Sequence, residues 1–169
     1  TFGVSLSDKF SELYKKINTT KNNLEFDLEK IHDDLIEKEK ARGAFLCEYE
    51  LFKQHFQLEI RASQRNNSSL QICLVSVVNT KGGIPPLNKL NPYIEKLENV
   101  IKSSLRASDI FARYSVSQYI IMLPDTSYEN AHIVLDRIKN NCKQAINIHG
   151  VGVHLDLKNY CETSKELIK

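Results

Sequence analysis

Arg106 and Asp109, separated by two residues, are the clearest pair of side chains in this chain that could do chemistry together. A guanidinium can hold a phosphate through its N–H donors, and a carboxylate can accept an N–H of a ligand. The same residues also suit a structural role, because arginine is favourable at the end of a helix and aspartate is common in turns. Since RxxD alone is a weak motif, the sequence favours the structural role and keeps ligand binding as the alternative.

A polar turn begins at Ser115, with five residues between it and Asp109, and separates two apolar stretches at 109–114 and 118–123. Two such stretches around a short turn predict a β-hairpin. The turn and the start of the second stretch comprise Ser115, Val116, Ser117, Gln118 and Tyr119. Small polar groups with an aromatic ring would suit a contact with another protein, whereas Tyr119 could instead belong to the core. Both readings stay open at this stage.

No other grouping of side chains predicts catalysis or metal binding. The histidines and cysteines lack the spacing of metal sites, and no two cysteines form CxxC. Cys73 lies in an apolar stretch and Cys142 on the apolar side of a predicted helix, which indicates buried thiols in a reducing compartment. The Gly82-Gly83 loop lacks the Lys-Ser/Thr of a phosphate-binding loop. We therefore expect a cytoplasmic protein with no cofactor and no metal.

The segments that position these residues alternate between helical and strand patterns. Leu70 to Val78 is almost wholly apolar and predicts a central strand covered on both faces. Helices are predicted at 48–66, at 87–105 and after Pro124, where Asp125 or Thr126 would be the cap, and a last strand within 146–157. The order of helix, strand, helix, hairpin, helix and strand predicts an α/β fold of the α+β kind, with helices against a mixed, mostly antiparallel sheet.

A further helix is predicted at 24–40, ahead of the α/β region. Its apolar residues Leu24, Leu28, Ile31 and Leu35 alternate steps of four and three, which is the spacing of a two-helix coiled-coil seam. They could equally dock the helix on its own domain. Four positions do not separate these two arrangements, so the dimer seam is one of two alternatives.

Charge and hydropathy exclude several classes of function. The net charge of +2 provides no concentrated basic face, so we expect DNA to be bound only through another domain of the full-length protein. The longest apolar runs have the length of strands, so we expect no membrane span. The chain begins without Met and in mid-pattern, so we interpret it as a fragment of a longer protein.

At the predicted hairpin the chain resembles a known family. Residues 106–124 read Arg-Ala-Ser-Asp-Ile-Phe-Ala-Arg-Tyr-Ser-Val-Ser-Gln-Tyr-Ile-Ile-Met-Leu-Pro. This is similar to the stretch of diguanylate cyclases that ends in Arg-Tyr/Leu-Gly-Gly-Asp-Glu-Phe, an apolar strand and Leu-Pro. Ser115 to Tyr119 then occupies the GGDEF position, and the resemblance extends over about two-thirds of the chain, from Glu48 to Leu157. It implies a GGDEF-like fold.

A closer resemblance is to the C-terminal region of Firmicute regulators of the SARP type. The segments 2–17, 43–53 and 113–130 resemble, in that order, the end of the helical activator domain, the junction after it and the degenerate GGDEF-like part. The resemblance implies a DNA-binding domain outside this chain. It divides the chain into the end of the activator domain at 1–18, a linker helix at 19–43 and a degenerate GGDEF-like domain at 44–169.

The resemblance also implies which residues the cyclase chemistry would need. In the family, Mg²⁺ is held by acidic residues of the first strand and of the pentapeptide, and here these positions fall on Ser76, Val78, Ser117 and Gln118. Neutral oxygens do not offset the dehydration of Mg²⁺. Ser115 and Val116 replace two glycines that let the turn approach the nucleotide. We therefore expect that the chain is not an enzyme.

Three functions follow from the sequence and the resemblance together. The leading hypothesis is a non-catalytic regulatory and dimerisation module that passes a signal to the DNA-binding domain. In this hypothesis the chain forms a homodimer. The second is a receptor for cyclic di-GMP or another nucleotide through Arg106 and Asp109, whose spacing from the turn matches the inhibitory site of GGDEF domains. The third is a residual nucleotide cyclase.

Overall fold

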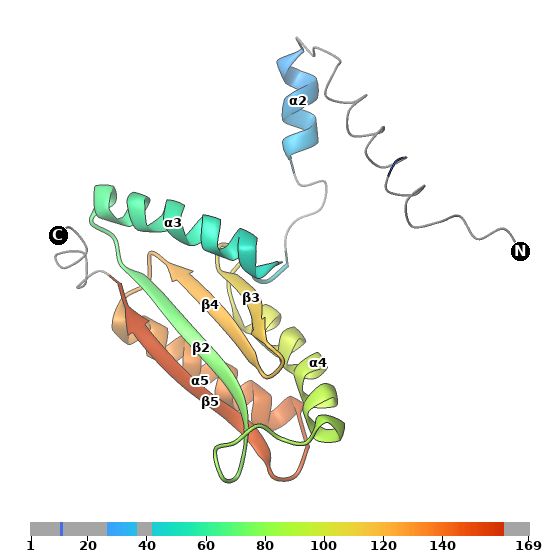
Figure 1. The fold of residues 1–169 in the computed structure, drawn as a ribbon. Coiled ribbons are helices and arrows are strands. Elements are labelled where there is room, and N and C mark those ends of the chain that lie inside the picture. The colour runs from blue at the N-terminus through green and yellow to red at the C-terminus, as the bar shows by residue number, and fades with distance from the viewer. Residues whose placement is uncertain (1–10, 12–26, 37–41, 161–169) are drawn as a thin grey trace, which may run out of the picture. The chain divides into compact units, whose positions relative to one another are not determined.

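The computed structural model describes residues 11, 27–36 and 42–160, and the chain divides into two compact units, Thr1–Lys40 and Ala41–Lys169 (Figure 1). Leu24, most of the predicted activator segment at 1–18 and the residues after 160 lie outside the described part. The predicted domain boundaries after residues 18 and 43 stay predictions.

The first unit contains one described helix of eight residues, α2 (Leu28–Leu35). Asp27 caps it, since its carboxylate accepts a hydrogen bond from the Glu29 N–H at 3.1 Å. None of the residues of α2 is buried. The apolar residues Leu28, Ile31 and Leu35 are 75%, 40% and 79% exposed. Three of the four residues of the predicted stripe therefore lie on a helix, and each of these three is exposed.

The second unit is built on one five-stranded sheet with the strand order β1-β3-β4-β2-β5. Only β1 and β3 are parallel, while the other three pairs are antiparallel. The predicted mixed, mostly antiparallel sheet is confirmed. The strands are β1 (Phe45–Cys47), β2 (Leu70–Asn79), β3 (Ile110–Ser115), β4 (Gln118–Pro124) and β5 (Val151–Asn159).

Helices cover the two faces of this sheet unequally. Helices α4 (Leu87–Ser104) and α5 (Tyr128–Ala145) lie against one face, and α3 (Tyr49–Asn66) crosses the other (Figure 1). The α4 and α5 side holds the larger core cluster, which includes Leu97, Ile101 and Ile138. The α3 side holds a smaller one around Phe52 and Met122.

The alternation along β2 explains why one end of the sheet stays open. Cys73, Val75 and Val77 point into the larger core and are at most 1% exposed, whereas Leu74, Ser76 and Val78 on the α3 side are only half-buried. The prediction of a strand covered on both faces is therefore correct for the first residues of β2 and wrong for the last ones. The open end contains Ser76 and lies beside the start of β4, since Ser76 pairs with Gln118.

Two local details differ from the sequence prediction. Strand β1 was not predicted, because three residues are too few to display a strand period. Helix α5 is capped by Ser127, whose hydroxyl accepts from the Asn130 N–H, and not by Asp125 or Thr126. Asp125 has a φ of 48° and Thr126 is buried, so both belong to the turn before the helix.

Among the described helices, none combines the length and the apolar character that crossing a bilayer requires.

Candidate functional site

The β3–β4 turn holds the pentapeptide that the sequence singled out. Val116 is at the tip and is 62% exposed, while Ser117 is buried. The Ser117 carbonyl accepts a hydrogen bond from the Val77 N–H at 2.8 Å. The turn is therefore tied to β2 by its backbone as well as by the strands that flank it.

The structure brings Ser76, Gln118 and Ser115 together at the open end of the sheet. The Gln118 side-chain amide donates to the Ser76 hydroxyl at 2.9 Å, and the Ser115 hydroxyl donates to the Gln118 carbonyl oxygen at 3.0 Å. Ser76 and Gln118 are two of the positions where the resemblance places metal ligands. Neutral side chains that are hydrogen-bonded to one another occupy both positions. Neutral oxygens that already share hydrogen bonds are weaker ligands for Mg²⁺ than carboxylates.

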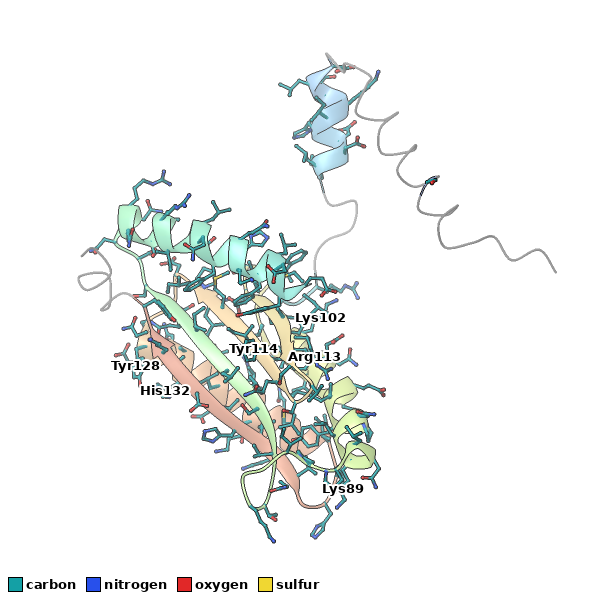
Figure 2. The ribbon with its side chains drawn as sticks, viewed as in Figure 1. Lys89, Lys102, Arg113, Tyr114, Tyr128 and His132 are labelled. Atoms are coloured by element: carbon teal, nitrogen blue, oxygen red, sulfur yellow. The ribbon has the colours of Figure 1, made fainter. Side chains whose placement is uncertain are left out.

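Arg113 fixes the shape of the turn, which sequence reasoning did not foresee. Its Nε donates to the Ser115 carbonyl at 2.8 Å and its Nη2 to the Val116 carbonyl at 2.6 Å. Its guanidinium also lies 5.4 Å from the centre of the Tyr119 ring. Figure 2 shows Arg113 and Tyr114 on β3, near the turn. A cation that binds two successive carbonyls holds the turn in one conformation.

Tyr119 belongs to the core and not to the surface. Its side chain is fully buried, and its hydroxyl donates to the Glu98 carboxylate on α4 at 2.8 Å. Burial and the hydrogen bond to Glu98 raise the pKa of Tyr119 to about 12, so the phenol stays protonated. Tyr119 therefore connects the turn, through Arg113, to helix α4.

The loop after β2 uses its own backbone donors. The Asn79 side-chain oxygen accepts from the Lys81 N–H at 2.8 Å and from the Gly83 N–H at 3.1 Å, and the Asn79 carbonyl accepts from the Gly82 N–H at 3.0 Å. These N–H groups are the ones that would otherwise cradle a phosphate. The loop therefore acts as a connection between β2 and α4 whose backbone donors are already used.

Arg106 and Asp109 form the turn between α4 and β3, in which the Arg106 side chain is exposed and Asp109 is buried. Asp109 is fully buried, and its Oδ2 accepts from the Arg106 N–H at 2.8 Å. The Arg106 guanidinium donates to the Thr126 hydroxyl at 2.7 Å and lies 3.8 Å from Asp109. Burial raises the pKa of Asp109, against the lowering effect of the Arg106 N–H and of the charges of Arg106 and Arg137. Both residues thus have structural partners, and ligand binding by them stays a prediction.

The described residues contain no group of three or more histidine, cysteine or acidic side chains placed to hold a metal ion. Cys47, Cys73 and Cys142 are free thiols, and the last two are buried. Cys161 lies outside the described residues.

The comparisons with known proteins identify the fold. No family model and no curated protein match the chain. Solved structures do match. A DGC protein from Thermotoga maritima matches with a TM-score of 0.57 at 19% identity, over 69% of this chain and 82% of that one.

Two longer matches extend over nearly the whole chain. The diguanylate cyclase SiaD from Pseudomonas aeruginosa, in complex with its activator SiaC, matches with a TM-score of 0.61 at 17% identity, over 93% of this chain and 65% of that one. The coiled coil and GGDEF domain of DgcB from Caulobacter crescentus, in complex with c-di-GMP, matches with a TM-score of 0.57 at 12% identity, over 92% of this chain and 83% of that one.

These comparisons contradict the prediction that the chain is not an enzyme, because the structures it resembles are diguanylate cyclases, which are enzymes. That prediction was based on the side chains at a few positions. Those side chains determine how well a metal ion binds there, but they do not determine the fold. The five-stranded mixed sheet and its flanking helices are a GGDEF-like fold, shared with diguanylate cyclases.

Proposed function

We propose that this chain is the regulatory, self-associating part of a bacterial transcription regulator of the SARP type. In this proposal the GGDEF-like domain receives a signal, and the helical segment ahead of it passes the signal to a DNA-binding domain outside this chain. The proposal combines the resemblance of the three sequence segments with the GGDEF-like fold and the geometry of α2.

The uncovered apolar stripe of α2 carries the proposal. An isolated helix shorter than about 12 residues is marginal in water, so a helix of eight residues with no buried side chain needs packing from elsewhere. Burying a Leu or Ile side chain contributes roughly 1.5–3 kcal/mol. Leu28, Ile31 and Leu35 have the spacing of a coiled-coil seam, so a second copy of α2 would supply that packing.

The DgcB structure supports this reading of α2. It includes a coiled coil together with its GGDEF domain, and its match extends over 92% of this chain. A coiled coil together with a GGDEF domain is thus a combination that a solved structure contains.

The turn network supplies a path along which a signal could travel inside the domain. Val116 is exposed at the tip, Arg113 binds the turn carbonyls, and Tyr119 joins this turn to Glu98 on α4. A partner that displaced the tip would break hydrogen bonds shared with a core residue. A local contact would therefore affect the packing between the sheet and α4.

The seam is tested by placing a charge in it. We expect Leu28→Asp and Ile31→Asp each to convert a dimer of the chain into a monomer, because an unpaired carboxylate in an apolar seam is costly. Light scattering coupled to size exclusion measures the mass. Asp33→Lys is the matched control, since it changes a charge on the same helix outside the stripe, and it should leave the dimer intact. An unchanged mass in both seam variants would remove α2 from the proposal.

A nucleotide receptor is the second candidate, and one observation favours it. Asp109 Oδ1 is buried and has no hydrogen-bond partner among the described residues, while the neighbouring Arg106 side chain is 56% exposed. A ligand that donates an N–H and offers a phosphate would complement this pair. Calorimetric titration with cyclic di-GMP should give heat that Arg106→Ala abolishes and Arg61→Ala, an exposed arginine on α3, preserves. Absence of heat at high micromolar dinucleotide would reject this candidate.

A further inference from the structure

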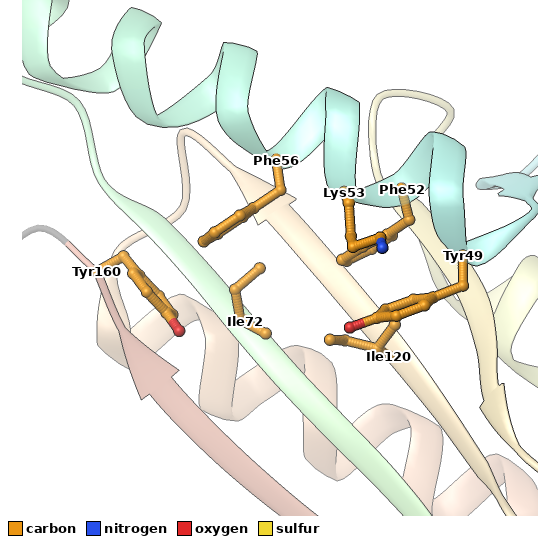
Figure 3. A pocket seen from close by; sticks show the side chains of 7 residues that line it. All are labelled: Tyr49, Phe52, Lys53, Phe56, Ile72, Ile120 and Tyr160. Carbon is orange, nitrogen blue, oxygen red and sulfur yellow. The ribbon is translucent and has the colours of Figure 1, made fainter.

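Helix α3 and the sheet form the walls of a half-open pocket of about 160 Å³, away from the β3–β4 turn. Figure 3 shows the helix side chains above it, the two isoleucines below it and a tyrosine at one end. Its lining consists of four aromatic rings, two isoleucines and one lysine: Tyr49, Phe52, Phe56, Tyr160, Ile72, Ile120 and Lys53.

The walls of this pocket favour one flat ring. Ile72 and Ile120 form the sheet side, and Phe52 and Phe56 form the helix side. The rings of Phe56 and Tyr160 meet edge to face at 5.1 Å, which closes one end. A cavity of about 150 Å³ lined by apolar side chains accepts benzene. A pocket of about 160 Å³ therefore fits a single aromatic ring with a small substituent.

The polar groups of the lining determine what that substituent is. The hydroxyls of Tyr49 and Tyr160 point toward the space between them in Figure 3, and Lys53 is the one charged residue of the lining. An aromatic enclosure often binds an organic cation, but the ammonium of Lys53 repels one. A single cation beside hydroxyl donors instead complements a single negative charge.

The ion pair between Lys53 and Glu50 leaves the Lys53 ammonium available to bind a ligand. Its ammonium lies 2.7 Å from Glu50, but the side chain of Glu50 is 80% exposed and that of Lys53 is 50% exposed. An exposed ion pair of this kind contributes little stability. A carboxylate on the ligand could therefore replace Glu50 at small cost, with the ring of Tyr49 already 5.4 Å from the ammonium.

We propose that this pocket binds a small aromatic carboxylate, with one ring between α3 and the sheet and its carboxylate on Lys53. This binding site is separate from the proposed self-association of α2 and from the Arg106–Asp109 pair. The ring would contact the four apolar side chains of the walls, and the carboxylate would accept from Lys53 and from the hydroxyl of Tyr49.

The test is a titration of the full chain with benzoate, followed by ¹⁵N–¹H correlation spectra. We expect saturable shifts at residues of α3, β2 and β4 around the pocket. Benzamide has the ring without the charge, and cyclohexanecarboxylate has the charge without the flat ring. Each should bind about tenfold more weakly, because each lacks one of the two features that the pocket recognises.

Two exposed residues make the test specific to this site. Lys53→Gln should weaken benzoate binding about tenfold and leave benzamide unchanged, whereas Glu50→Gln should strengthen benzoate binding by freeing Lys53. Lys96→Gln, at an exposed lysine on α4, should change neither. The proposal is overturned if benzoate gives no saturable shifts, if the shifts map elsewhere, or if Lys53→Gln binds benzoate as tightly as the unaltered chain.

Discussion

At the scale of single residues, the turn is held by contacts that the sequence does not display. The resemblance assigned Ser76 and Gln118 to the same site, and the structure places their side chains in hydrogen-bond contact. The role of Arg113 could not be predicted, because its acceptors are backbone carbonyls whose direction depends on the conformation of the turn. The side chain of an isolated arginine gives no sign of such partners.

Asp109 leads to a prediction about how the free energy of unfolding changes with pH. Its folded-state pKa is raised mainly by burial, so between the ordinary carboxyl value of 3.8 and the raised value the folded chain keeps a proton that the unfolded chain releases. The free energy of unfolding contributed by this group therefore falls as pH rises through that window. Asp109→Asn retains an acceptor for the Arg106 N–H and removes the buried charge.

We expect the stability of Asp109→Asn relative to the unaltered chain to increase as pH rises from about 4 to about 7. Urea unfolding at several pH values measures this difference. Asp136→Asn, which removes an exposed carboxylate on α5, should not reproduce that rise. A difference that falls with pH would mean that the Asp109 carboxylate is stabilised in the fold.

At the scale of elements, the long periodic segments were predictable and the short ones were not. The helix expected at 48–66 is Tyr49–Asn66, and the hairpin expected at 109–123 is β3 and β4. Strand β1 was missed because its pairing with β3 is a long-range contact of three residues. The cap of α5 was misplaced because Asp125, Thr126 and Ser127 are all residues that can cap a helix.

Gly43 lies just before β1, and its backbone conformation leads to a prediction about stability. Its φ is +75°, and a Cβ added there would overlap the Lys102 carbonyl at the end of α4. The Ala44 N–H also donates to that carbonyl at 3.1 Å. We expect Gly43→Ala to destabilise the chain by more than about 1 kcal/mol, because the backbone conformation and the close approach both resist a side chain.

Gly152→Ala on β5 is the matched control for this prediction. No atom lies within 4 Å of a Cβ built at Gly152, and its φ is outside the left-handed region. Urea unfolding midpoints should separate the two variants clearly. Equal midpoints would mean that β1 can move away from α4 without cost.

At the scale of the whole molecule, the larger core protects two thiols. Cys73 and Cys142 are at most 1% exposed, and burial raises their pKa to about 12 and about 11. Only thiolates react readily with alkylating agents. We expect both residues to resist iodoacetamide near pH 8 until the domain unfolds, as measured by peptide mass spectrometry in increasing urea. Labelling of either residue without denaturant would indicate that the core opens locally.

In their described residues, the two units of the chain differ in how much of their apolar surface is buried. The unit Ala41–Lys169 contains the sheet and both core clusters, whereas α2 in the unit Thr1–Lys40 has no buried residue. The unit Ala41–Lys169 therefore has its own core, whereas the proposal assigns the packing of α2 to a second copy of the chain. Self-association through α2 is the claim on which the proposed regulatory role depends most.

Sedimentation equilibrium of the unaltered chain, over concentrations from low to high micromolar, tests that claim most directly. Pairing through α2 predicts a mass that approaches twice the 19.4 kDa of the chain as the concentration rises. A mass that stays at 19.4 kDa over the whole range would contradict it.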